Sequence, residues 1–275
     1  MEVIIMVVQH NMQAANANRM LGITVNAQQK STEKLSSGYR INRAADDAAG
    51  LAISEKMRSQ VRGLDRAATN AQDGVSVVQT AEGALSTVHS MLQRMNELAT
   101  QAANDTNTDK DRGNIQDEIT QLTSEINRVQ STTTFNTQKL LNGSFNDKKL
   151  QVGAQKDQTI SISISNMDAS SLGVGSLTVT DNAAAGTSMS KVQEAIDIVS
   201  KTRSKLGAIQ NRLEYTIDNL NTTSENTQAA ESRIRDTDMA KEMVSFSKDN
   251  ILAQAGQSML SQANQSTQGV LSLLQ

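Results

Sequence analysis

DTDMAKEMVSFSKDNILAQAGQSMLSQANQSTQGVLSLLQ, residues 236–275, carries an amphipathic helical pattern at the end of the chain. Gln, Asn and Ser cover the face opposite its apolar stripe, and Ser266 is the one polar interruption within that stripe. The stripe recurs at helical spacing through Leu252, Ala255, Met259, Ala263, Val270 and Leu274. Because this stripe is too thin to form a core alone and its back is too polar for a bilayer, we expect the helix to need a partner.

The best partner helix within the chain lies at the opposite terminus. A row of apolar residues steps by sevens there and is broken at Gln28, with Asn11, Asn18 and Val25 on the neighbouring row. The row consists of Val7, Ala14, Leu21 and Leu35. We predict that the two terminal helices pair with each other and need further copies of the chain to be covered. The alternative is that both ends are frayed tails.

Two longer heptad rows lie between the termini and are natural mates. The first, in a helix from Gly50 to about Asn104, is Leu64, Ala71, Val78, Leu85, Leu92 and Ala99. The second is Val192, Val199, Leu206, Leu213 and Leu220. A shorter helix after the polar turn Asn104 to Asp109 has one apolar face, formed by Ile115, Ile119, Leu122, Ile126 and Val129.

The pattern changes to alternation between these helices. Leu150 and Val152, and then Ile160, Ile162 and Ile164, alternate with polar residues as half-buried strands do, with a hairpin tip at 155–158. Leu177 and Val179 suggest a third short strand. We expect Gly186 to end this insert, and Thr187 or Ser188 to cap the next helix.

These patterns predict a mainly α fold. It is a long antiparallel helical bundle or coiled-coil rod with paired terminal helices and a small β-hairpin insert at one end, the chain termini being at the other. The predicted domains are a terminal-helix domain, residues 1–45 and 231–275, and a helical rod domain, residues 46–230, with the insert at about 146–186.

Composition narrows the class of protein. Only 2% of the 275 residues are aromatic, and the chain has no Pro and no Cys, which suits long uninterrupted helices and excludes disulfides. A net charge of −3 gives no general attraction to nucleic acid or anionic lipid. Residues 1–8 are apolar but too short for a signal-peptide core, so we expect any export to use another route; Met6 is an alternative start.

Catalytic constellations are absent from the sequence. The two histidines, His10 and His89, have no second ligand at zinc spacing, so we expect no enzyme activity, cofactor or metal. Asp46 and Asp47 could be a carboxylate pair for catalysis or metal binding. Capping of the following helix is the simpler interpretation, since acidic groups favour the unpaired N–H groups at a helix start.

Several long segments resemble bacterial flagellin. In the first half these are VVQHNMQAANANRMLG (7–22), SSGYRINRAADDAAGLAISEKMRSQVRGL (36–64) and NAQDGVSVVQTAEGAL (70–85). In the second half they are LGAIQNRLEYTIDNL (206–220), ESRIRDTDMAKEM (231–243) and VLSLLQ (270–275). The similarity covers nearly everything except residues 150–186.

The resemblance implies a secreted subunit that polymerises into the extracellular flagellar filament for motility. It also implies unfolded export by the flagellar type III route, and partners that include identical subunits, an export chaperone, and the filament cap and hook–filament junction proteins. The terminal helices would line the inner tube, with the polymerisation seam at Val7, Ala14, Leu21, Leu35, Leu252, Met259, Val270 and Leu274. A hook–filament junction protein and a chemoreceptor-like coiled coil are the alternatives.

Members of this family are also ligands of the host Toll-like receptor 5 (TLR5). The residues that match the receptor-contact motif are Gln93, Arg94, Leu98 and Gln101, with Glu118 in the following helix. We expect Arg94 and Leu98 to be displayed together on one helix face. Leu122 departs from the family pattern, which carries a basic residue there in strongly stimulatory members. An adhesin or receptor ligand acting as a monomer is the rival function from another class.

Overall fold

The computed structural model describes the backbone of residues 10–273 and the side chains of residues 10–266. This part of the chain forms five helices and two short hairpins, so the predicted mainly α fold is confirmed. The helices are α1 (Met12–Ser37), α2 (Ala48–Ala102), α3 (Asp109–Thr132), α4 (Asn182–Arg235) and α5 (Met239–Leu273). The strands are β1 (Thr134–Phe135), β2 (Gln138–Lys139), β3 (Lys148–Gln151) and β4 (Thr159–Ile162).

The chain divides into two compact units. The terminal unit consists of Met1–Ser59 and Thr227–Gln275, and the central unit consists of Gln60–Asn226. The terminal unit holds α1, α5 and the helix ends joined to them, whereas the central unit holds α3, the insert and most of α2 and α4.

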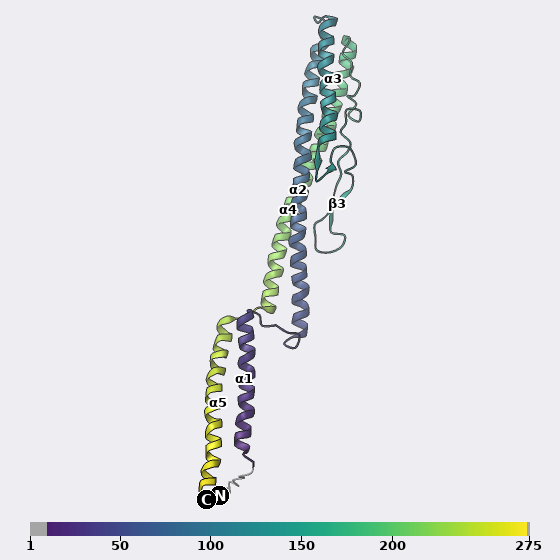
Figure 1. Ribbon diagram of the computed structural model, residues 1–275. Helices are drawn as coiled ribbons and strands as arrows, with labels where there is room; N and C mark the ends of the chain where they lie inside the picture. The colour runs from purple at the N-terminus through teal and green to yellow at the C-terminus, as the bar shows by residue number, and fades with distance from the viewer. Residues whose placement is uncertain (1–9, 274–275) are drawn as a thin grey trace. The chain divides into compact units, whose positions relative to one another are not determined.

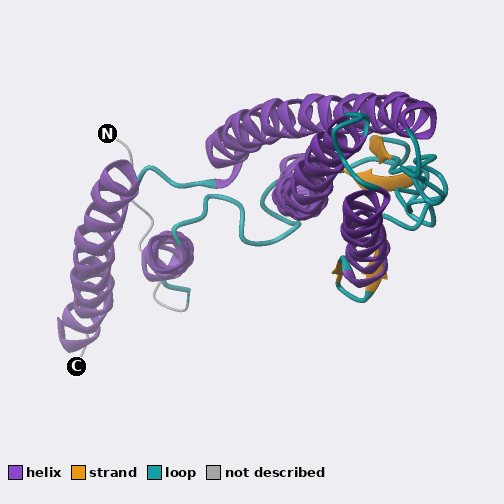
Figure 2. Cartoon of the chain, turned by 90° about the horizontal axis from the view of Figure 1, so that it is seen from above, coloured by secondary structure: helices purple, strands orange, loops and turns teal. Residues whose placement is uncertain are grey.

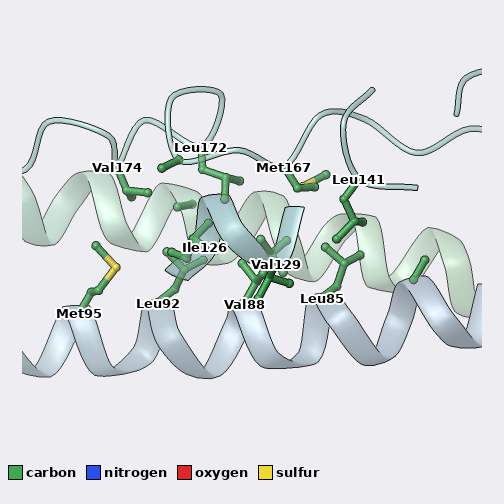
Figure 3. Packing of buried hydrophobic residues seen from close by; sticks show 14 of the residues in the cluster. Leu85, Val88, Leu92, Met95, Ile126, Val129, Leu141, Met167, Leu172 and Val174 are labelled. Carbon is green, nitrogen blue, oxygen red and sulfur yellow. The ribbon is translucent and has the colours of Figure 1, made fainter. Parts of the chain in front are cut away.

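The central unit contains the hydrophobic core. Both predicted heptad rows are buried along their whole length, with no member more than 6% exposed. The apolar face of α3 packs on part of these rows, and Figure 3 shows Ile126 and Val129 lying over Leu92 and Val88 of α2. This cluster excludes water from side chains of three helices, and such burial is the main driving force of folding.

The insert lies along the helices of the central unit. β3 and β4 pair antiparallel, with Leu150 opposite Ile160. The hairpin packs against α2, since the chain at Leu150 and Ala154 approaches Gly74 and Gly63. Figure 2 shows the strands and loops gathered to one side of the helices of this unit. The prediction that the β-element sits at one end is therefore wrong.

Leu177 and Val179 are buried but form no strand, contrary to the prediction. The backbone here pairs with a side chain of α3 instead of a neighbouring strand. Gln116 Nε2 donates to the Leu177 carbonyl at 3.0 Å, and the Val179 N–H donates to Gln116 Oε1 at 2.9 Å. A single amide side chain thus satisfies polar groups that a strand would have paired.

The start of α4 also differs from the prediction. The helix begins at Asn182, before Gly186, because Asp181 Oδ1 accepts the Ala184 N–H at 2.6 Å and caps the first turn. Gly186 is therefore inside the helix and exposed to solvent. The N-terminus of α3, by contrast, follows the predicted polar turn and is closed by a capping box between Thr108 and Asp111.

In the terminal unit, α1 and α5 run antiparallel side by side (Figure 1). α1 is capped at Gly38, whose φ of 77° is the left-handed conformation that favours glycine, and the Gly38 N–H donates to the Lys34 carbonyl. Asp47 Oδ1 accepts the Gly50 N–H at 2.9 Å at the start of α2, which confirms the capping interpretation of this aspartate. None of the helices that the structure describes combines the length and hydropathy needed to cross a bilayer.

Candidate assembly surface

The seam between α1 and α5 mixes small and polar side chains with a few large apolar ones. The α1 side of the seam is a 3–4 repeat of half-buried or buried positions: Ala14, Ala17, Leu21, Thr24, Gln28, Ser31 and Leu35. The α5 side repeats in the same way through Glu242, Phe246, Asp249, Ala253, Gly256, Leu260 and Ala263. Of these, only Ser31 is buried. The pairing of the terminal helices is therefore as predicted, but within residues 10–266 it encloses no hydrophobic core.

Specific contacts fix the antiparallel register of this pair. Asn11 Nδ2 donates to the Ala263 carbonyl at 3.0 Å at one end, and Lys34 Nζ lies 3.9 Å from Glu242 Oε1 at the other. Between them, Gly256 permits close approach, since a Cβ at this position would lie 3.3 Å from Leu21 Cδ1.

The seam uses the predicted Ala14 row of α1, but its companion row on α1 and its row on α5 differ from those that the sequence pattern suggests. Ala17, Thr24 and Ser31 accompany the Ala14 row of α1, whereas Val25 on the expected companion row is exposed. On α5, Leu252 is 49% exposed and Met259 is 60% exposed. Ala255 is exposed as well, so three predicted stripe residues remain uncovered within the chain. Val7, Val270 and Leu274 of the predicted seam lie outside the residues whose side chains the structure describes.

Exposed large hydrophobic side chains are concentrated in the terminal unit. Among the described residues, this unit holds eleven of the thirteen that are exposed; the other two, Ile198 and Tyr215, lie on α4 of the central unit. The eleven are Met12, Met20, Ile23, Val25, Ile53, Met239, Met243, Val244, Ile251, Leu252 and Met259. An exposed apolar surface of this extent is typical of an interaction site.

A groove between α1 and α5 collects part of this apolar surface. Met20 and Leu21 line it from α1, and Leu252, Gly256 and Met259 line it from α5. The groove has a volume of about 720 Å³. Its walls are apolar side chains interspersed with Gln, Asn and Ser, so the terminal unit presents both apolar area and hydrogen-bonding groups to a partner.

The two connectors of the terminal unit are fastened to each other. Tyr39 and Asp236 form an isolated β-bridge, and the Arg40 N–H donates to the Arg235 carbonyl at 2.7 Å. The Arg235 guanidinium lies 4.6 Å from the centre of the Tyr39 ring and donates to Glu55 Oε1 at 2.7 Å. These contacts hold the end of α1 and the start of α5 together and so set the helix pair in place.

Asp46 closes the connector that precedes α2. Its Oδ2 accepts the backbone N–H groups of Arg43 at 3.0 Å and Asn42 at 3.2 Å. These two hydrogen bonds favour the ionised form and lower the pKa of Asp46. The carboxylate therefore has a structural role in a turn, and the pair Asp46 and Asp47 is used for backbone capping.

The residues that match the receptor-contact motif lie on α2 and α3 of the central unit. Arg94 Nε donates to Glu118 Oε1 at 2.9 Å and its Nη1 lies 3.2 Å from Glu97 Oε2, and these acidic partners raise the pKa of Arg94. Gln93 and Gln101 are exposed on α2. Leu98 is only 2% exposed and belongs to the core cluster, so it does not stand beside Arg94 as an exposed apolar residue.

Both halves of the chain match bacterial flagellin. The N-terminal helical region of bacterial flagellin matches residues 8–146, and its C-terminal helical region matches residues 189–274. A flagellin of Halalkalibacterium halodurans is 55% identical over 271 residues, covering 98% of this chain and all of that protein. The flagellin of Bacillus subtilis is 51% identical and covers 97% of this chain and 99% of its own length.

Solved structures agree with these matches. The crystal structure of Bacillus cereus flagellin is 31% identical, with a TM-score of 0.50 over 59% of this chain and 94% of that one. A putative flagellar hook-associated protein from Vibrio parahaemolyticus shares the fold at 16% identity, with a TM-score of 0.58 over 70% of this chain and all of that one. The chain therefore belongs to the bacterial flagellin family, whose members are structural subunits of the flagellar filament.

Proposed function

We propose that the terminal unit is the surface through which copies of this chain polymerise, and that the central unit is a rod that folds independently of assembly. The observation that carries this proposal is the contrast in burial. The central unit buries two complete heptad rows, whereas α1 and α5 expose most of the large hydrophobic side chains that the structure describes on them. Contact with identical neighbours would remove this apolar surface from water. Such burial of apolar surface is favourable and drives most protein association.

The same contrast in burial assigns a different role to each of the two units. Residues 1–45 and 231–275 form the inner tube of the filament, and residues 46–230 form the surrounding rod domain. Leu252 and Met259 supply apolar contacts to neighbouring subunits, while Ala14 and Leu21 hold α1 against α5 within each subunit. In this arrangement the intrachain seam orders the helix pair, and the outward-facing stripe joins the pair to other copies.

Deletion of residues 257–275 tests this assignment. The truncated chain is expected to keep a folded central unit, because none of residues 257–266, the deleted residues whose side chains the structure describes, belongs to the core cluster. It is expected to stay in the supernatant under salt or seeding conditions that sediment the full chain as long filaments. Far-UV circular dichroism and urea unfolding of the truncated chain provide the control for folding. Normal filaments seen by electron microscopy would refute the assignment, and short rings or collars from the full chain would indicate a junction protein.

We also propose that the subunit is exported unfolded by the flagellar type III route and assembles into an extracellular filament. An export chaperone binds its exposed terminal helices before export, and the filament cap and hook–filament junction proteins contact these helices in the assembled structure. A chain without Pro and Cys supports this, because refolding outside the cell needs no X-Pro isomerisation or disulfide formation. Fusion to a hyperstable domain should block export, and a destabilised version of the same domain should restore it. Equal export of both fusions would contradict the proposal.

A second proposed role is recognition by TLR5 through Gln93, Arg94, Gln101 and Glu118, with Leu98 supporting this surface from beneath. The exposed Arg94 and Glu118 side chains, held together by their ion pair, support it. Arg94→Ala should weaken receptor binding without loss of polymerisation. Arg128→Ala is the matched control, because Arg128 is also exposed and paired with a glutamate of its own helix. With Leu122 in place of a basic residue, we expect weak receptor activation. Equal binding by both variants would refute this role.

A further inference from the structure

The methionines of this chain are distributed unequally between its two units. Ten of the twelve methionines lie within the described residues, and five of these are exposed. All five exposed methionines are on α1 or α5: Met12, Met20, Met239, Met243 and Met259. The central unit keeps its methionines buried or half-buried, and Met95 and Met167 are fully buried in the core cluster.

Two of the exposed methionines occupy opposite walls of the groove described above. Met20 projects from α1 and is 53% exposed, and Met259 projects from α5 and is 60% exposed. Leu252 lies on the same wall as Met259. The side chains of the pair are thus exposed to small solutes in the free subunit, on the surface that assembly is proposed to cover.

We propose that Met20 and Met259 are oxidation sites at which a peroxide controls whether a subunit can join the polymer. In this reaction a sulfur lone pair attacks one oxygen of hydrogen peroxide, an S–O bond forms as the O–O bond breaks, and a proton transfers to the departing oxygen to give water. The thioether is oxidised by two electrons to the sulfoxide and the peroxide is reduced. This inference rests on the proposed function, because it assigns the oxidation sites to the assembly surface.

The consequence for assembly follows from the chemistry of the product. A sulfoxide is polar and accepts hydrogen bonds, so placing it in an apolar contact leaves a buried polar oxygen without a partner. The intrachain seam of α1 and α5 is made by other residues, and the core of the central unit is out of reach of the oxidant. Oxidation therefore leaves the fold of the subunit intact and penalises only its contact with neighbours.

Treatment of the free subunit with hydrogen peroxide, followed by peptide mass spectrometry, tests the first half of the proposal. Met20 and Met259 are expected to be oxidised under conditions that leave Met95 and Met167 intact, with an unchanged far-UV circular dichroism spectrum. Equal oxidation of all four residues, or sparing of Met20 and Met259, would overturn the assignment of the sites.

Elongation of untreated seeds by the treated subunit tests the second half. We expect the critical concentration to rise by about tenfold or more, which corresponds to about 1.4 kcal/mol, and enzymatic reduction of the sulfoxides by methionine sulfoxide reductases to reverse it. The variant M20L/M259L should elongate seeds equally well before and after peroxide. The matched variant M12L/M239L, which also removes one exposed methionine from each helix, should remain sensitive.

The outcomes separate the two proposals. If the untreated chain does not elongate seeds, the assembly function itself fails. If the untreated chain elongates and the fully oxidised chain elongates equally well, the oxidation proposal alone is wrong. Protection by M12L/M239L instead of M20L/M259L would also overturn it, because the sensitive residues would then lie elsewhere on the terminal helices.

Discussion

The same substitution, leucine to alanine, should mainly destabilise the fold in the central unit and mainly weaken assembly in the terminal unit. Leu92 is 0% exposed in the core of the central unit, whereas Leu252 is 49% exposed on α5. Leu92→Ala removes buried methyl groups and leaves a cavity, so we expect the free energy of unfolding of the subunit to fall by about 2–5 kcal/mol. Leu252→Ala should lower it by about 1 kcal/mol or less, because the position is already half open to water.

The remaining exposed half of Leu252 sets the expected effect on assembly. Full burial of a leucine side chain stabilises by about 1.5–3 kcal/mol. If neighbours bury the half that the subunit leaves exposed, the substitution should weaken subunit addition by roughly 0.7–1.5 kcal/mol. At about 1.4 kcal/mol per tenfold, the critical concentration should rise by about 3- to 12-fold.

Urea unfolding of the free subunit and sedimentation of the polymer measure the two quantities separately. Leu92→Ala should shift the urea midpoint strongly, and Leu252→Ala should shift the critical concentration with little change in the midpoint. The reasoning would be refuted if Leu252→Ala destabilised the subunit as much as Leu92→Ala, or if it left the critical concentration unchanged.

Two further predictions concern the central unit. Gly74→Ala should destabilise the subunit by about 1–3 kcal/mol through overpacking, because a Cβ there would lie 2.3 Å from Leu150 Cδ1. Gly83→Ala in the same helix is the control, because a Cβ there meets no neighbouring atom within 4 Å. It should stabilise the subunit by up to about 1 kcal/mol in urea unfolding. Hydrogen bonds from Thr108 lower the pKa of Asp111, so ionised Asp111 stabilises the folded state. This stabilisation is present above the pKa that Asp111 has in the unfolded chain. It is lost as the pH falls through the lower pKa that Asp111 has in the folded chain. NMR titration should place the pKa of Asp111 below its ordinary value and return it toward that value in Thr108→Ala, and an unchanged pKa in the variant would contradict the capping-box account.

The helices of the central unit could be predicted because one effect, the burial of apolar area, governs which side chains occupy their inner faces. Both heptad rows and the α3 face follow from spacing alone. The β3–β4 hairpin likewise follows from the alternation of apolar and polar residues, but the β1–β2 hairpin could not be predicted in this way. The β1–β2 hairpin turns through Asn136 and Thr137, both with positive φ, and it lacks the Asn-Gly pair that usually signals such a turn.

The candidate site shows where periodicity becomes ambiguous. In α5 nearly every row carries some apolar residue, so spacing alone does not separate the row facing α1 from the row facing away. Close packing resolves this choice, since Ala253, Gly256 and Ala263 permit the approach of α1 and the larger Leu252 and Met259 are left outside. At Leu98 the family resemblance identified the position but not its environment. The side chain is buried in the core, so it cannot contact a partner directly.

Amide hydrogen exchange of the free subunit and of the polymer is the most direct test of the account. In dilute solution the backbone amides of α2, α3 and α4 within the central unit should be protected. Those of α1 and α5 should exchange rapidly, because the side chains described for that helix pair form no hydrophobic core. In the polymer α1 and α5 should become protected as well. Strong protection of α1 and α5 in the isolated subunit, unchanged on polymerisation, would contradict the claim that identical neighbours complete the terminal unit.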